Sequence, residues 1–318
     1  MAEDDIKFGT VYSGLDRVIE PLVFAQRSEA MGFDSLWVTE VLLRGSLDPF
    51  TFLSAAAART RSITLGTVVA VLPFRHPIQW VKLALSVDAL SSGRLILGVG
   101  IGGEFPKELE MMGLDMRSRA SISDETLEAM RRLLTESNIT HDGKSFQFQD
   151  VTMSSPTGEK PHIPIWVGGE WHDGVAPGVL KRAARFGDGF VPVDMPFDAY
   201  GEVRQKIEAY ASEMGRDPSS FEWAIMFWAC LGHSAEEARR EAEEHISARL
   251  GFHWSLDNSK ANILGTPRDF VGTIQRYVSA GVRHFIFNMA CRRPDVMRQY
   301  QVIAREVIPH FKKGRGKP

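Results

Sequence analysis

The feature of this sequence that most constrains its fold is a regular alternation of short β-branched runs and amphipathic helical patterns. Such alternation is typical of βα units that share one parallel sheet. The runs predicted as strands are residues 6–12, 33–38, 62–70, 94–100, 163–169, 188–193, 221–232 and 283–289. Because these eight runs show no break in composition, we predict one closed (β/α)8 barrel as a single domain over residues 1–318, rather than two open sheets.

The segments between the strands carry helical patterns, and several of them end at a glycine. Helices are predicted over about residues 16–31, 49–60, 77–90, 123–135, 177–186, 197–214, 235–250, 267–280 and 295–311. Two insertions interrupt this rhythm, at about 138–162 and 251–266. The first contains HDGKSFQFQDV, whose alternation predicts a surface hairpin. Insertions of this length in a barrel are usually lids or binding elements.

Composition excludes several classes of protein. A net charge of −3 offers no broad basic surface, so we expect neither nucleic acid nor membrane as a partner. Cys230 and Cys291 lack metal-ligand spacing, so we expect no metal, no disulfide and two small buried hydrophobic residues. The N-terminus has no signal-peptide pattern and no apolar run is long enough to span a bilayer, which predicts a cytoplasmic protein.

Candidate site residues should follow the C-terminal ends of the strands, where barrel enzymes hold their chemistry. Thr39, Glu40 and Arg44 follow the second predicted strand, and Arg75 and His76 follow the third. These polar side chains come directly after buried apolar runs. They are therefore our first candidates for contact with a ligand.

Glycines crowd the end of the fourth predicted strand, in GVGIGGE at residues 98–104. Backbone without side chains, as at Gly100 and Gly102, lets a flat ring approach closely. The pattern overlaps a dinucleotide-binding fingerprint, and a Rossmann fold is one alternative. However, the βαβ context with an acidic residue at the end of the next strand is missing.

The turn after the fifth predicted strand is suited to an anion. Gly168 and Gly169 lead into a helix whose first turn holds Pro177, Gly178 and Val179, and Lys181 and Arg182 follow. Free N–H groups at a helix start, with positive charge nearby, favour a phosphate. The alternative is an ordinary barrel turn with a helix-starting proline.

Five segments in the same order and spacing resemble the luciferase-like monooxygenase family. These segments are GFDSLWVTE, FRHPIQWVKLALSVDALSSGRLILGVGIGGEFPKELEMMG, RSRASISDETLEAMRRLL, PHIPIWVGG and RAARFGDGFVP. The family includes bacterial luciferases, flavin-dependent monooxygenases and deazaflavin-dependent oxidoreductases. The resemblance covers about residues 30–195 and implies a barrel that binds FMN or coenzyme F420 at its C-terminal rim.

The resemblance also implies positions for the cofactor. A bulge with a non-prolyl cis peptide, which presses on the central ring, would fall at Val68–Val69. In the deazaflavin-type members the phosphate lies at the turn formed here by Gly168, Gly169, Gly178 and Val179. Luciferases instead hold the flavin phosphate with an arginine after the fourth strand, where this chain has Ile101 between Gly100 and Gly102. This departure favours F420 over FMN.

A second departure concerns the residues assigned to catalysis. Many deazaflavin-dependent relatives carry Asp-His after the second strand, where this chain has Glu40 and Val41. By resemblance Glu40 contacts the cofactor or acts as a general acid; alternatively it is a structural carboxylate paired with Arg44 or Arg75. His76 either turns toward the rim as a catalytic group or only begins a helix. The matching pair Asp124 and Glu125 is expected to be structural.

The resemblance predicts an F420-dependent oxidoreductase that transfers a hydride between the reduced deazaflavin and a small organic substrate. The alternatives are an FMN-dependent two-component monooxygenase served by a flavin reductase, a flavin-binding barrel without turnover, and a barrel lyase that takes a phosphorylated substrate. Family members are commonly dimers, so we expect a homodimer. The side chains predicted to line the substrate cavity are Trp171, His172, His253 and Trp254, with Phe227 and Trp228 as weaker members.

Overall fold

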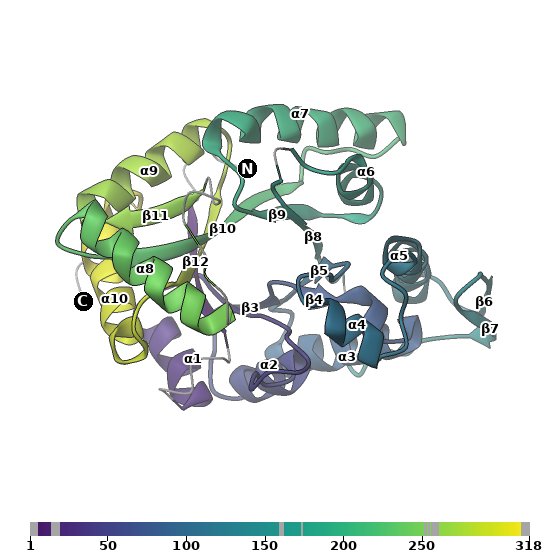
Figure 1. The fold of residues 1–318 in the computed structure, drawn as a ribbon. Helices are drawn as coiled ribbons and strands as arrows, with labels where there is room; N and C mark the ends of the chain where they lie inside the picture. Colours follow the sequence, from purple (N-terminus) through teal and green to yellow (C-terminus); the bar gives the residue numbers. More distant parts are fainter. Residues whose placement is uncertain are drawn as a thin grey trace.

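Eight parallel strands close into a barrel with helices around its outside (Figure 1). The computed structural model describes residues 6–13, 20–158, 162–172, 174–250, 253, 255 and 261–312. The barrel strands are β1 (Lys7–Tyr12), β2 (Ser35–Val38), β3 (Thr64–Thr67), β5 (Leu95–Gly100), β8 (Ile165–Glu170), β9 (Gly189–Val193), β10 (Glu222–Leu231) and β12 (His284–Met289). The ring closes because β10 pairs in parallel with both β9 and β12. The predicted barrel is therefore confirmed.

The helices follow the strands, as the alternation predicts. They are α1 (Pro21–Ala30), α2 (Pro49–Ala57), α3 (Pro77–Ser91), α5 (Arg119–Thr135), α6 (Pro177–Phe186), α7 (Phe197–Glu213), α8 (Ala235–Leu250), α9 (Pro267–Ser279) and α10 (Val296–Val302). Proline occupies the first turn of α1, α2, α3, α6 and α9, where its missing N–H removes no helical hydrogen bond. The predicted bounds of α6 and α8 match those observed.

Helix α4 and the end of the last helix differ from the predicted elements, whereas the break in the third strand falls at the bulge that the resemblance implies. A short helix, α4 (Pro106–Met111), follows β5 and was not predicted. The third strand is interrupted at residues 68–69, and β4 (Ala70–Val71) then resumes the pairing with β5. The last predicted helix changes its winding after α10, with a π turn over Ile303–Val307 and a 3-10 turn over Ile308–His310.

Each insertion contributes strands. The first forms the predicted hairpin from β6 (Ile139–Asp142) and β7 (Gln147–Val151), which pair antiparallel. The second contains a strand that was not predicted, β11 (Asn262–Gly265). It pairs with residues 228–231 of β10, beyond the last residue that β9 pairs. This extra strand extends the sheet at the C-terminal rim.

Two tryptophans fill the N-terminal half of the barrel. The rings of Trp37 and Trp166 lie 5.1 Å apart. A Cβ at Gly66 would lie 2.3 Å from the Trp37 ring, and one at Gly189 would lie 2.5 Å from the Trp166 ring. The barrel accommodates both indoles only because these facing positions have no side chain. This end of the barrel is consequently a packed core.

A buried histidine completes this core. Ser35 Oγ lies 2.6 Å from His284 Nε2 and accepts a 2.7 Å hydrogen bond from Trp37 Nε1. Burial, together with the positive charges of Lys7 and Lys312, lowers the pKa of His284 to about 3. The imidazole is therefore neutral at physiological pH, and its place is structural.

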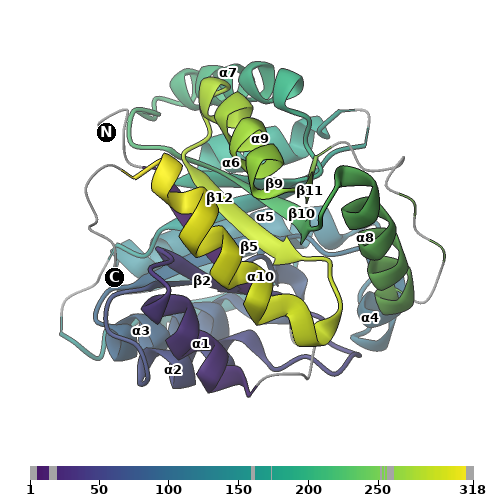
Figure 2. The same ribbon diagram turned by 90° about the vertical axis from the view of Figure 1, so that its left-hand side faces the viewer.

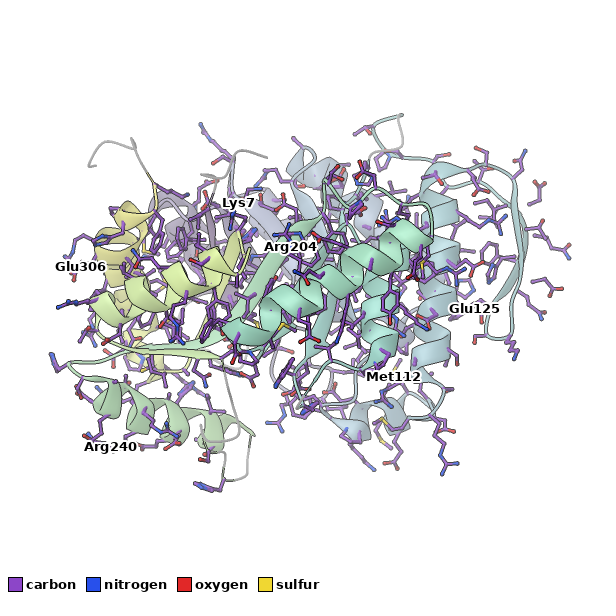
Figure 3. All side chains as sticks on the ribbon, turned by 90° about the horizontal axis from the view of Figure 1, so that it is seen from above. Lys7, Met112, Glu125, Arg204, Arg240 and Glu306 are labelled. Carbon is purple, nitrogen blue, oxygen red and sulfur yellow. The ribbon has the colours of Figure 1, made fainter. Side chains whose placement is uncertain are left out.

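The two ends of the barrel are marked in Figure 3 by Lys7, the first residue of β1, and by Met112, which directly follows α4. Both cysteines are free and buried, as predicted. None of the helices in the described part of the chain is long and apolar enough to cross a membrane.

Replacing His284 should reduce the acid sensitivity of the fold. The unfolded chain binds a proton at His284 near pH 6.5, whereas the native state binds it only near pH 3. Stability from this residue is therefore lost as the pH falls from 6.5 to 3, by up to about 1.4 kcal/mol per pH unit. Urea unfolding of His284→Gln over this range should show a flatter slope, with exposed His310→Gln as the control. A slope equal to that of the wild type would contradict the assignment.

Candidate cofactor site

The candidate site is built around the break in the third strand. Val68 and Val69 are joined by a cis peptide bond, at the predicted position. The Val69 side chain fills the space between two neighbouring strands: a Cβ at Gly100 would lie 2.6 Å from Val69 Cγ2, and one at Gly168 would lie 2.8 Å from Val69 Cγ1. Three predicted cofactor-binding residues, Val69, Gly100 and Gly168, therefore meet at one point of the rim.

Close packing accounts for the glycines of this region. A Cβ at Gly98 would lie 1.9 Å from the carbonyl oxygen of Thr67. Gly102 has φ +71°, and its Cβ would lie 2.8 Å from Val71. The contacts among the third, fourth and fifth barrel strands thus require the glycine run. This is a second reason for the glycines, in addition to the predicted close approach of a flat ring. Since the sheet is a closed barrel, the Rossmann alternative is wrong.

Small and polar side chains continue the interior face at the C-terminal end. Side chains alternate along a strand, so Ser13 lies on the same face as the interior residue Val11, and Asn288 on the same face as Ile286. Both are buried, and Thr39 Oγ1 donates to the Ser13 carbonyl at 3.5 Å. Ser13 and Asn288 were not singled out from the sequence, although the two-residue period would have identified them.

Glu40 is held by two donors. Its side chain is only 4% exposed; Arg75 Nη2 lies 2.5 Å from Oε1, and the Val71 N–H donates to Oε2 at 2.7 Å. With both oxygens engaged, the carboxylate fixes the backbone of β4. These contacts support the structural alternative for Glu40 and identify Arg75, rather than Arg44, as its partner. Arg44 instead lies 4.6 Å from the Phe105 ring.

Arg75 is itself enclosed. Its guanidinium lies 5.2 Å from the Phe50 ring and 5.0 Å from the Trp80 ring, and it also pairs with Asp48 at 2.8 Å. Burial on its own would disfavour the charge, but the hydrogen bond to Glu40 and the two carboxylate charges outweigh it and raise the pKa of Arg75. Arg75 is a permanent cation that anchors the loop after β2 to the start of α3.

His76 begins α3. Its Nδ1 accepts a 3.2 Å hydrogen bond from the Ile78 N–H, and Gln79 completes a capping box. The ring lies 5.0 Å from the Phe146 ring in the hairpin, and burial together with the charge of His141 lowers its pKa. These contacts support the helix-starting alternative, and a catalytic role for His76 stays a prediction.

Helix α6 follows the turn after β8, and its N-terminus has no side-chain cap. Ala176, which precedes α6, provides no side-chain cap. A Cβ at Gly178 would meet no atom within 4 Å, whereas one at Gly169 would lie 3.0 Å from Val179. The Val179 N–H already donates to the Ala176 carbonyl at 2.9 Å. The Gly178 N–H, unlike that of Val179, donates to no group in the described part of the chain.

Lys181 and Arg182, the two basic residues nearest the start of α6, do not contribute to this turn. Arg182 is buried and its Nε donates to Asp124 at 2.6 Å, while Lys181 Nζ lies 5.7 Å from the Tyr210 ring. Sequence adjacency suggested positive charge near the helix start, but these side chains face α5 and α7. An anion here would be held by backbone dipoles alone.

Asp124 and Glu125 on α5 make structural contacts, as expected from the sequence. Asp124 binds Arg182. Glu125 accepts from the Phe146 N–H at 2.8 Å and lies 3.3 Å from His141 Nε2, and it points toward the hairpin (Figure 3). These contacts hold the hairpin against α5.

The predicted substrate residues are placed differently from one another. Trp171 is half-buried, and its Nε1 is buried with no hydrogen-bond partner among the residues that the structure describes. His172 is exposed and lies 3.1 Å from Glu170. Phe227 packs against Tyr277 outside the barrel and is core, so its place in the cavity is wrong. His253 is exposed, and Trp254 lies outside the described residues.

The chain belongs to the luciferase-like monooxygenase family, whose sequence model matches residues 9–283. The 4-hydroxyprotoasukamycin monooxygenase of Streptomyces nodosus subsp. asukaensis is 26% identical, over 91% of this chain and 86% of that protein. The F420-dependent glucose-6-phosphate dehydrogenase of Intrasporangium calvum is 27% identical, over 89% of this chain and 92% of that protein. The fold is shared with the oxygenating constituent of the 3,6-diketocamphane monooxygenase of Pseudomonas putida, solved with FMN, at a TM-score of 0.75 and 17% identity, over 96% of this chain and 98% of that one.

The ion pair at the rim should be energetically coupled. Glu40→Gln should lower the free energy of unfolding by about 3 kcal/mol, because it leaves a buried guanidinium without its main partner. Asp48→Asn should cost below about 1 kcal/mol, because Asp48 is 46% exposed and Asn still caps α2. Urea unfolding of Glu40→Gln, Arg75→Gln and the double variant measures the coupling. Additive effects of the two single changes would contradict this account.

Proposed function

We propose that this protein is a cofactor-dependent oxidoreductase that transfers a hydride between F420 and a small organic substrate at the C-terminal mouth of its barrel. The observation that carries this proposal is the joining of the third, fourth and fifth barrel strands at Val69, beside an uncapped α6. Val69 would contact one face of the ring, and the Gly178 N–H would face the phosphate. The predicted contacts of Gly169 and Val179 are secondary to these.

The residues present fit such a cofactor. Val69 is half-buried at the rim, and the space around the Gly178 Cβ position is open. When bound, the cofactor supplies the redox chemistry. The chain's own residues bind and orient it: Glu40 and Arg75 fix β4, Ser13 and Asn288 offer hydrogen bonds on the interior face, and the tryptophans below exclude water.

A specific observation also favours the second candidate, an FMN-dependent monooxygenase. One of the curated relatives is named a monooxygenase. This reaction would need a reductase partner to deliver reduced flavin. Ile101 favours the F420-dependent candidate, because a luciferase-type phosphate site would have an arginine at this position. A flavin-binding barrel without turnover is distinguished from both by assaying the loaded protein for oxidation of reduced cofactor.

The side chain at residue 178 provides the test. Gly178→Leu should fold normally, since its Cβ meets no neighbouring atom, yet it should weaken cofactor binding by about tenfold or more, because the added side chain takes space that a phosphate at this helix start would need. Gly201→Leu on α7, whose Cβ position is equally open, is the matched control.

Quenching of the seven tryptophans during titration with F420 and with FMN gives both affinities. Tighter binding of F420 supports the first candidate, and tighter binding of FMN supports the second. Equal affinity of Gly178→Leu and the wild type for both cofactors would refute the phosphate position. The homodimer is a separate proposal, which light scattering at micromolar concentration would test.

A further inference from the structure

A cavity of about 310 Å³ lies beside the barrel mouth at the end of β1, and Ser13 is one of its lining residues. It is bounded by the end of β1, by α1, and by residues 293–297 at the start of α10. Figure 2 shows α1 and α10 next to each other on this side of the barrel. Its size is at the lower limit of pockets that bind small organic ligands. Residues 14–19, between β1 and α1, lie outside the described part of the chain.

The floor of the cavity is apolar. Tyr12 and Phe24 are buried, and their rings are 5.4 Å apart in an edge-to-face arrangement. Val23, Val296 and Met297 complete the apolar part of the lining. Such a floor stabilises a short alkyl or aryl group by removing it from water.

The edge of the cavity is positively charged. Arg27 comes from α1 and Arg293 from the segment that precedes α10, so the lining includes two arginines from two different elements. No acidic residue is among the described lining residues.

The cavity is separate from the predicted phosphate position. In the ring of strands, β1 is followed by β2, β3, β5 and then β8. The turn after β8 is therefore four strands away in a ring of eight, on the opposite side of the barrel. A cofactor phosphate at Gly178 would not occupy the cavity beside Arg27.

We propose that this cavity binds an amphipathic oxyanion, with its apolar body on the floor and its carboxylate or phosphate between Arg27 and Arg293. Guanidinium groups recognise both anions through paired hydrogen bonds. The apolar floor excludes a fully hydrated ion such as acetate as the best ligand. This inference goes beyond the proposed function and does not rest on it.

The test uses the full chain without cofactor and three six-carbon probes: hexanoate, hexyl phosphate and hexanamide. Ligand-observed NMR titration should show saturable binding of at least one of the two anions, about tenfold tighter than that of the neutral amide and of acetate. The tighter anion identifies the oxyanion class. Equal affinities for hexanoate, hexyl phosphate and hexanamide, or no saturable binding of either anion, would overturn the proposal.

Variants locate the binding. Arg27→Gln and Arg293→Gln should each weaken the anion by about tenfold, and Val23→Trp should block the body of either anion. Arg298→Gln on α10 removes an arginine from outside the lining and should leave affinity unchanged. Because Arg27 and Arg293 are exposed, both glutamine variants should retain the thermal unfolding profile of the wild type. Unchanged anion affinity in the Arg27→Gln, Arg293→Gln double variant would refute the site.

Discussion

The packing of Val69 between Gly100 and Gly168 is the contact on which the barrel mouth depends. One valine side chain occupies the space that two Cβ atoms would otherwise take, so three consecutive barrel strands meet at their C-terminal ends. The regular pairing of β3 with β5 stops before this point, and β4 resumes pairing with β5 after residues 68 and 69. The shape of the candidate site follows from this contact rather than from any charged group.

The charged groups of this region lie outside the Val69 contact. Glu40 reaches across to the N–H of Val71 and to Arg75, and Arg75 in turn lies between Phe50 and Trp80. The carboxylate is thereby tied to the strand that carries the break, and the guanidinium to the helices outside it. A buried pair of this kind contributes little net energy, but it specifies one position for the groups it joins. The residue proposed from the sequence as an acid thus acts on the site through the backbone of β4.

Periodic patterns in the sequence predict where the strands and helices lie, but they do not predict which way individual side chains point. The two-residue and 3.6-residue periods placed all eight barrel strands, and they gave the bounds of α6 and α8. Helix α4 and strand β11 are too short to show a period. Arg182 and Lys181 are next to a helix start in sequence, yet the helical rotation turns them toward α5 and α7. Likewise, the glycine run signalled close approach, but the sequence could not say that Val69 fills the space.

The two ends of the barrel interior are suited to different tasks. At the N-terminal end Trp37, Trp166 and a neutral His284 leave no room for a ligand. At the C-terminal end several interior positions carry neutral hydroxyl or amide groups, such as Ser13, Thr39 and Asn288. Neutral groups of this kind orient a ring and a substrate, but they do not readily exchange protons. A barrel mouth with such neutral groups is suited to a reaction in which the cofactor carries out the redox step. The protein then positions the reactants and excludes water.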